Sequence, residues 1–143
     1  MDLLAYICGS KIVSVSAAQM GQGVAVKEDK MSIVLSFQDG SVGTVNYFGN
    51  GSKSYPKEML EVFSDGRVLR LNNFRKLEGF GFKGFRKFKT RKMDKGHQTQ
   101  FNTFVERVEK GGEPLIGFDE IVNVTLASFA AVTSAVEGRM IHL

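Results

Sequence analysis

Three side chains in a glycine-rich loop offer the clearest chemistry for binding a ligand. Lys53, Tyr55 and Lys57 follow a predicted β-hairpin and surround Pro56, which restricts the residue before it to extended backbone. The lysines can bind anionic groups, and the tyrosine offers a ring and a hydroxyl. Loops held by a rigid sheet carry binding residues disproportionately. We expect these residues to contact a ligand, although a purely solvated loop fits the same composition equally well.

A second group of candidates lies in a basic and aromatic segment. It contains Phe80, Phe82, Phe85 and Phe88 among Lys83, Arg86, Lys87, Lys89, Arg91, Lys92 and Lys95. Cations beside rings can bind the phosphates and stack the bases of a single-stranded nucleic acid. The alternative is an edge strand whose rings enter the core while its charges face water. No recognised nucleic-acid motif accompanies the charge, so we do not expect nucleic acid, and Lys83 and Arg86 are candidates for binding another anionic ligand.

The glycines of this region match the dinucleotide-binding pattern G-x-G-x-x-G over residues 79–84. That pattern holds a pyrophosphate only when it follows a buried strand and opens a helix. The residues that follow it, Phe85-Arg86-Lys87-Phe88, show neither helical periodicity nor a helix cap. We therefore predict that the match is accidental.

The remaining reactive side chains form no catalytic set. His97 begins a predicted helix and could donate to or accept from a ligand, but no partner for a catalytic base is evident. A surface or capping role is favoured, and His97 is otherwise a candidate for ligand binding. Cys8, beside apolar residues, is predicted to be a packed thiol. The two histidines and one cysteine lack zinc-ligand spacing, so we expect no metal site.

Length and composition are those of one globular domain. The chain has 143 residues, of which 43% are hydrophobic and 24% charged, with a net charge of +4. Its apolar runs are too short or too interrupted for a bilayer, and no signal-type segment begins the chain. With a single cysteine, a reducing, cytoplasmic location is the expectation.

Alternating residues predict antiparallel strands before two C-terminal helices. The expected strands cover residues 11–17, a short stretch through Val24 and Val26, 31–37, 42–47, 59–63, 67–71 and 82–88. Residues 139–143 form either a final short strand or a tail. Asp39-Gly40 and Asp65-Gly66 predict type I′ turns. Helices are expected over 2–8, 97–110 and, N-capped by Asp119, 119–137. This order predicts an α+β fold, an open and mostly antiparallel sheet with helices on one face.

Several segments also occur in a familiar order. They are Asp2-Leu3-Leu4 with Gly9, residues 32–47, the hairpin at 61–67, Phe101 to Val105, and Pro114 ahead of residues 118–121. Together they resemble the C-terminal domain of the Gfo/Idh/MocA oxidoreductases, most closely the branch in which this module follows a zinc-type alcohol dehydrogenase-like region. The resemblance covers nearly all of residues 1–143.

The resemblance implies a sheet covered by helices on one face, whose other face forms a homodimer. It also implies that the complete enzyme transfers a hydride between NAD(P) and a sugar or nucleotide sugar. In that family a Rossmann domain holds the nucleotide, and the catalytic lysine, aspartate and histidine precede the position of Asp2. This chain lacks that domain and those residues, so we expect no catalysis and no cofactor binding by the chain alone. Its expected ligand is a sugar-type small molecule, and no membrane partner is expected.

A stand-alone binding module is the alternative. It would use the sheet face or the basic segment to bind an anionic ligand, a nucleic acid or a protein.

Overall fold

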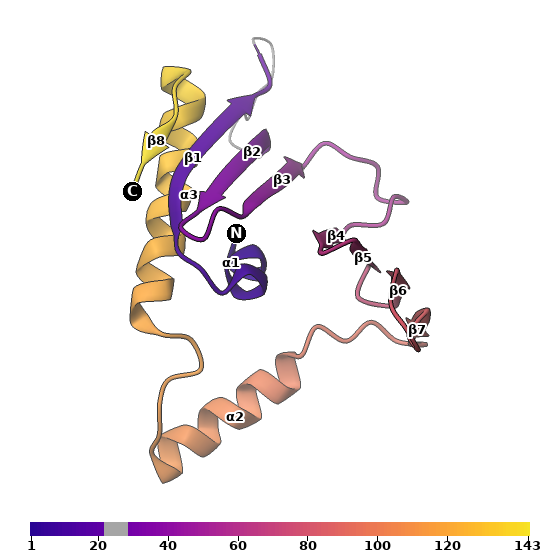
Figure 1. The fold of residues 1–143 in the computed structure, drawn as a ribbon. Helices are drawn as coiled ribbons and strands as arrows, with labels where there is room; N and C mark the ends of the chain where they lie inside the picture. Colours follow the sequence, from indigo (N-terminus) through magenta and orange to yellow (C-terminus); the bar gives the residue numbers. More distant parts are fainter. Residues whose placement is uncertain (22–28) are drawn as a thin grey trace. The chain divides into compact units, whose positions relative to one another are not determined.

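The computed structural model describes residues 1–21 and 29–143, which form two compact units (Figure 1). The first unit comprises residues 1–50 and 112–143, and the second comprises residues 51–111. Each contains one four-stranded antiparallel sheet. The predicted α+β class is confirmed, with the described strands divided between two sheets. The prediction of one domain over residues 1–143 stays a prediction, and Val24 and Val26 lie outside the described residues.

The first unit is a sheet covered on one face by a helix. Its elements are α1 (Asp2–Cys8), β1 (Ile12–Gln19), β2 (Lys30–Phe37), β3 (Val42–Phe48), α3 (Phe118–Glu137) and β8 (Ile141–His142). The strand order is β3-β2-β1-β8. Alternate residues of β2, namely Met31, Ile33, Leu35 and Phe37, are buried, as their period of two predicts.

Small residues on α3 let the helix approach this sheet closely. Ala127, Ala130 and Ala131 are buried in the same core as β2. Two polar side chains of α3 bond the backbone of β1. The Asn123 carboxamide accepts the Ile12 N–H at 2.8 Å and donates to the Ile12 carbonyl at 2.9 Å. The buried Ser134 hydroxyl accepts the Ala17 N–H at 2.9 Å. The helix is therefore aligned on β1 by directional bonds as well as by apolar contact.

The start of α3 differs from the sequence prediction. Its N-cap is Gly117, with no side-chain cap, and Asp119 lies in the first turn. The helix is buried on one face only, and Phe129 and Val136 are 65% and 71% exposed. By length and composition alone α3 meets the criterion for a membrane span, which the core helix of a soluble protein meets equally. Its inner face, however, packs as the cover of a sheet.

The turn between β2 and β3 also differs from the predicted type I′ turn. Gly40 has a positive φ of 89°, whereas Asp39 does not. The Gly40 N–H donates to the Phe37 carbonyl at 3.0 Å, and the Phe37 N–H donates to the Ser41 carbonyl at 2.9 Å. This is a type I turn followed by a left-handed glycine. The Asp39 carboxylate accepts the Ser41 N–H, which holds the aspartate in this turn and lowers the pKa of its carboxyl.

The second unit contains a meander and one helix. Its elements are β4 (Met59–Ser64), β5 (Arg67–Asn72), β6 (Lys76–Phe80), β7 (Lys87–Lys89) and α2 (His97–Lys110). The sheet order is β4-β5-β6-β7. The predicted strand 82–88 is instead a connection ending in β7, because Gly81 and Gly84 adopt positive φ values of 79° and 81°. The first and last helices of the chain start at Asp2 and Phe118, and the predicted helix 97–110 is confirmed.

This sheet has one mixed and one apolar face, and neither is deeply covered. Glu61, Arg70 and Glu78 lie in register on the mixed face, which also carries Lys76, Phe63, Val68 and Phe80. Leu60, Leu71 and Leu77 lie in register on the other. All residues of 51–111 are described, and none of them is buried. The second unit therefore has little core of its own.

Candidate ligand-binding site

The predicted substrate-binding residues all lie in the second unit, in two groups. Lys53, Tyr55 and Lys57 lie in the exposed connection before β4, and His97 is the first residue of α2. Lys83 and Arg86 lie in the connection from β6 to β7.

The sheet register places these groups at opposite ends. Met59, Asn72, Lys76 and Lys89 pair across the end where β4 begins and β7 finishes. Phe63, Val68 and Phe80 pair across the other end. At a rise of about 3.3 Å per residue, a strand such as β6 separates the two ends by roughly 13 Å. The structure thus brings the 53–57 loop and the start of α2 to one end and leaves Lys83 and Arg86 at the other.

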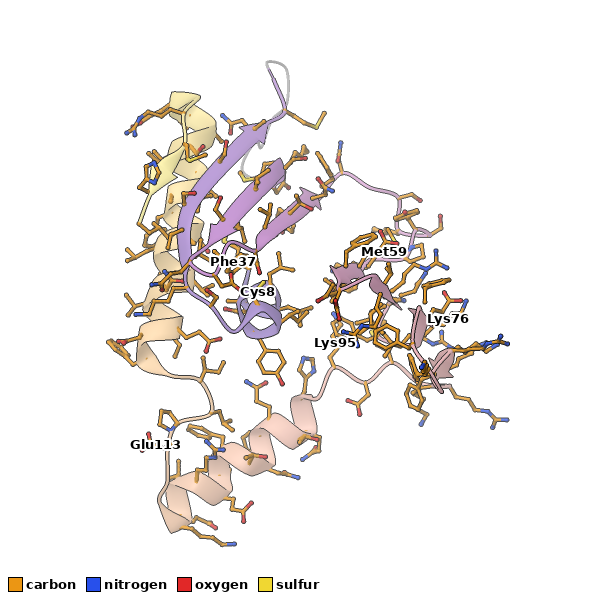
Figure 2. The ribbon with its side chains drawn as sticks, viewed as in Figure 1. Cys8, Phe37, Met59, Lys76, Lys95 and Glu113 are labelled. Carbon is orange, nitrogen blue, oxygen red and sulfur yellow. The ribbon has the colours of Figure 1, made fainter. Side chains whose placement is uncertain are left out.

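An ion pair joins the two chain segments that meet at the first end. The Lys95 ammonium lies 2.8 Å from a Glu58 carboxylate oxygen, and the two side chains are 33% and 42% exposed. Glu58 directly follows Lys57, and Lys95, which is labelled in Figure 2, precedes His97 by two residues. A partly exposed pair of this kind contributes at most about 1 kcal/mol to stability. Its consequence is positional, because it holds the end of the loop beside the start of α2.

The turn from β5 to β6 completes this cluster. Asn73 and Phe74 have positive φ values of 51° and 49°, and the Arg75 N–H donates to the Asn72 carbonyl at 3.0 Å. This is a type I′ turn, which normally has glycine at its second central position. The turn at Asp65-Gly66, predicted from the sequence, has that glycine. A phenylalanine in the left-handed region costs about 1 to 2 kcal/mol, so Phe74 holds a strained backbone.

Two further contacts connect this turn to the ion pair. The Asn73 N–H donates to the Glu58 carbonyl at 2.6 Å, and the Lys95 ammonium lies 5.4 Å from the centre of the Phe74 ring. The Asn73 carboxamide oxygen is buried and has no hydrogen-bond partner among the described residues. We call Glu58, Asn73, Phe74 and Lys95 the turn cluster.

The turn cluster has the groups needed to bind hydroxyls. An ammonium group has three N–H donors, and the Lys95–Glu58 contact uses one of them. The Glu58 carboxylate and the Asn73 carboxamide oxygen are acceptors. A sugar hydroxyl both donates and accepts, so adjacent hydroxyls complement this arrangement. Within residues 1–21 and 29–143 no group of three or more His, Cys, Asp or Glu side chains is placed to hold a metal ion.

The glycines near Lys83 and Arg86 serve packing and turning. A Cβ added to Gly79 would lie 2.5 Å from the Phe85 ring, and Phe82 and Phe85 pack edge to face with centroids 6.3 Å apart. The Gly79 N–H donates to the Arg86 carbonyl at 2.9 Å. Strand β7, and no helix, follows residues 79–84. The pattern G-x-G-x-x-G is accidental here, as predicted, and Lys83 and Arg86 remain exposed side chains of a turn.

Cys8 is a packed thiol, as predicted. It lies half-buried against the core of the first unit. Burial, and after it the negative charge of Asp39, raises the pKa of the thiol. A raised pKa lowers the thiolate fraction, so this cysteine is a poor nucleophile.

Comparison with solved structures identifies the fold. No protein-family model matches this sequence, and no curated protein matches it. An oxidoreductase from Agrobacterium radiobacter, in complex with NAD+, L-tartaric acid and magnesium, aligns with 99% of this chain at 18% identity and a TM-score of 0.78. Levoglucosan dehydrogenase, in complex with NADH and levoglucosan, aligns with 99% at 19% identity and a TM-score of 0.81. Aldose-aldose oxidoreductase from Caulobacter crescentus, complexed with glycerol, aligns with 99% at 17% identity and a TM-score of 0.75.

The chain has the fold of the C-terminal domain of Gfo/Idh/MocA oxidoreductases. It spans less than half of these similar chains, at 46%, 47% and 44% of their lengths. The fold implied by the sequence resemblance is confirmed.

Sequence reasoning missed the turn cluster. The Asn72-Asn73 pair marks a strand end, and asparagine tolerates positive φ, so a turn was foreseeable there. Nothing in the sequence indicates that Phe74 takes the glycine position or that Lys95 pairs with Glu58. Those contacts depend on the pairing of β4, β5 and β6.

Proposed function

We propose that this chain is the substrate-binding and dimerisation domain of an NAD(P)-dependent oxidoreductase that acts on a sugar or nucleotide sugar in the cytoplasm. The chain does not transfer hydride alone. The observation that carries the proposal is the fold match to levoglucosan dehydrogenase in complex with NADH and levoglucosan, at a TM-score of 0.81 over 99% of this chain.

In the complete enzyme, two domains would have different roles. A Rossmann domain holds NAD(P) and supplies the catalytic lysine, aspartate and histidine. This chain contacts the substrate through Lys53, Tyr55, Lys57 and His97, with Lys83 and Arg86 as outlying anion-binding side chains. Hydride transfer needs a bound nicotinamide and a titratable group within hydrogen-bond reach of the reacting hydroxyl, and both belong to the other domain.

Binding measurements test the two halves of this proposal. NAD+ and NADP+ are titrated into the chain by calorimetry, and we expect no binding. Glucose and UDP-glucose are titrated by ligand-observed NMR, and we expect at least one to bind. Tight NAD+ binding would show that the cofactor site is not confined to another domain. Failure of both sugars to bind would remove the substrate-binding role.

A stand-alone module for an anionic ligand is the second candidate. The cations Lys83, Arg86, Lys87, Lys89 and Lys92 form no ion pair with any described residue. Single-stranded DNA titrated at two salt concentrations distinguishes the candidates. Measurable binding that weakens steeply with salt supports the module, because released counterions drive such binding. Absence of binding at low salt supports the oxidoreductase domain.

A further inference from the structure

The turn cluster carries two energetic penalties that ordinary turn residues would avoid. Phe74 occupies a left-handed conformation that a glycine would adopt without strain. The Asn73 carboxamide oxygen is buried without a partner in the described structure, which costs about 1 to 3 kcal/mol. Strained backbone is concentrated at functional sites, and a buried polar group without a partner calls for an explanation of this kind.

The location of the cluster agrees with that interpretation. It lies at the end of the sheet that also holds the 53–57 loop and His97, and Glu58 and Lys95 link those two segments at 2.8 Å. The equivalent turn at the opposite end, Asp65-Gly66, has a glycine at its second position, and its aspartate is paired with Arg67 at 2.7 Å. Of the two described type I′ turns, the Asn73-Phe74 turn therefore has both penalties, and it is the one beside the predicted substrate residues.

We propose that the turn cluster binds two adjacent hydroxyl groups of a sugar-type ligand. One hydroxyl donates to the Asn73 carboxamide oxygen. The neighbouring hydroxyl accepts from the Lys95 ammonium and donates to the Glu58 carboxylate. This inference rests on the proposed function and specifies which residues of the domain recognise the substrate.

The side chains can reach a ligand by small rotations. Asn73 as a whole is only half-buried, and its terminal torsion is broad, so rotation of the carboxamide can expose the oxygen. Lys95 and Glu58 are partly exposed, and their contact is a single ion pair. The Phe74 ring beneath the ammonium keeps Lys95 close to the turn when Glu58 turns toward a ligand.

Matched variants separate this site from general effects on folding. Asn73→Gly removes the carboxamide and keeps the positive φ available, and Asp65→Gly makes the same kind of change at the other type I′ turn. Lys95→Met removes the ammonium from an exposed Lys–Glu pair. Lys110→Met does so at the pair with Glu106, which has the same 2.8 Å separation.

The experiment follows backbone and side-chain amide resonances of the chain during titration with D-glucose and with UDP-glucose. We expect resonances of Asn73, Phe74 and Lys95 to shift and those of Asp65 and Gly66 to stay. Asn73→Gly and Lys95→Met should each raise the dissociation constant at least about fivefold, and the two control variants should stay within about twofold.

The outcomes distinguish this proposal from the proposed function. Shifts confined to the 53–57 loop or the 83–86 connection, with Asn73→Gly binding normally, would overturn the turn-cluster site and leave the oxidoreductase domain standing. Absence of shifts with both sugars would overturn the site and the substrate-binding function together.

Discussion

The Ser134 hydroxyl accepts the Ala17 N–H at 2.9 Å, across a sequence separation of 117 residues. The same hydroxyl donates to the Arg139 carbonyl at 2.6 Å. Ser134 is 1% exposed. One buried hydroxyl therefore joins β1, α3 and the segment that leads to β8.

Replacing Ser134 by alanine should destabilise the first unit. The substitution leaves the Ala17 N–H and the Arg139 carbonyl without this partner in a buried site, at a cost of about 1 to 3 kcal/mol. Chemical denaturation followed by circular dichroism measures the change. Ser128→Ala is the control, because it makes the same change of helix propensity while its hydroxyl bonds, among the described residues, the Val124 carbonyl within α3 and the Met1 sulfur. Equal losses in both variants would show that the Ser134 bonds contribute nothing specific.

Phe74 should tolerate glycine better than alanine. Glycine adopts positive φ freely, whereas alanine keeps the steric conflict of a Cβ, so the glycine variant should be more stable by about 1 kcal/mol. Phe63 in β4 provides the control, since its φ is not positive and alanine should be the more stable replacement there. Urea denaturation of the four variants gives the comparison. If alanine exceeds glycine at both positions, the strain assigned to Phe74 is absent.

Local sequence patterns predicted most of the helices, strands and turns, because these elements form between residues that are close in the sequence. The period of two in Met31, Ile33, Leu35 and Phe37 and the helical spacing of Phe101, Phe104 and Val108 both gave the observed elements. Asp65-Gly66 formed its expected turn. Asp39-Gly40 did not, because the Asp39 carboxylate bonds the Ser41 N–H and holds a different turn.

The candidate site could be predicted only in part, for a reason of topology. Glu58 and Lys95 are 37 residues apart, and their contact exists only after four strands have paired. The sequence could not predict which of the six candidate side chains lie together, and strand register separates Lys83 and Arg86 from the others. Strand register depends on turn type and loop length, and a shift of one residue moves every side chain of a strand to the other face of the sheet.

Protonation of Glu78 should make the second unit less stable in acid than at neutral pH. Hydrogen bonds from Lys76, and after them from Arg70, lower the pKa of its carboxyl below the usual 4.5. A lowered folded pKa means that this contribution is present above the unfolded pKa and is lost as the pH falls through the folded value. Glu78→Gln should therefore reduce the free energy of unfolding near neutral pH and have less effect in strong acid.

Urea denaturation at neutral pH and in strong acid measures the change in the free energy of unfolding caused by Glu78→Gln. Glu109→Gln, in α2, removes a carboxylate that forms no ion pair with the described residues and serves as the control. A Glu78→Gln effect that is the same at both pH values would contradict the electrostatic explanation.

The uncovered face of the first sheet should form the predicted homodimer. Val34 is 43% exposed and pairs in register with Ser16 of β1 and Thr44 of β3, on the face away from the buried residues of β2. A lysine there would place a charge at the centre of that interface, where desolvation of an unpaired charge is costly. We expect Val34→Lys to be monomeric and the unmodified chain to be dimeric in analytical ultracentrifugation. Val136→Lys, on the exposed face of α3, is the control and should leave the dimer intact. A dimer that persists with Val34→Lys but dissociates with Val136→Lys would show that the interface lies on α3 and not on the sheet.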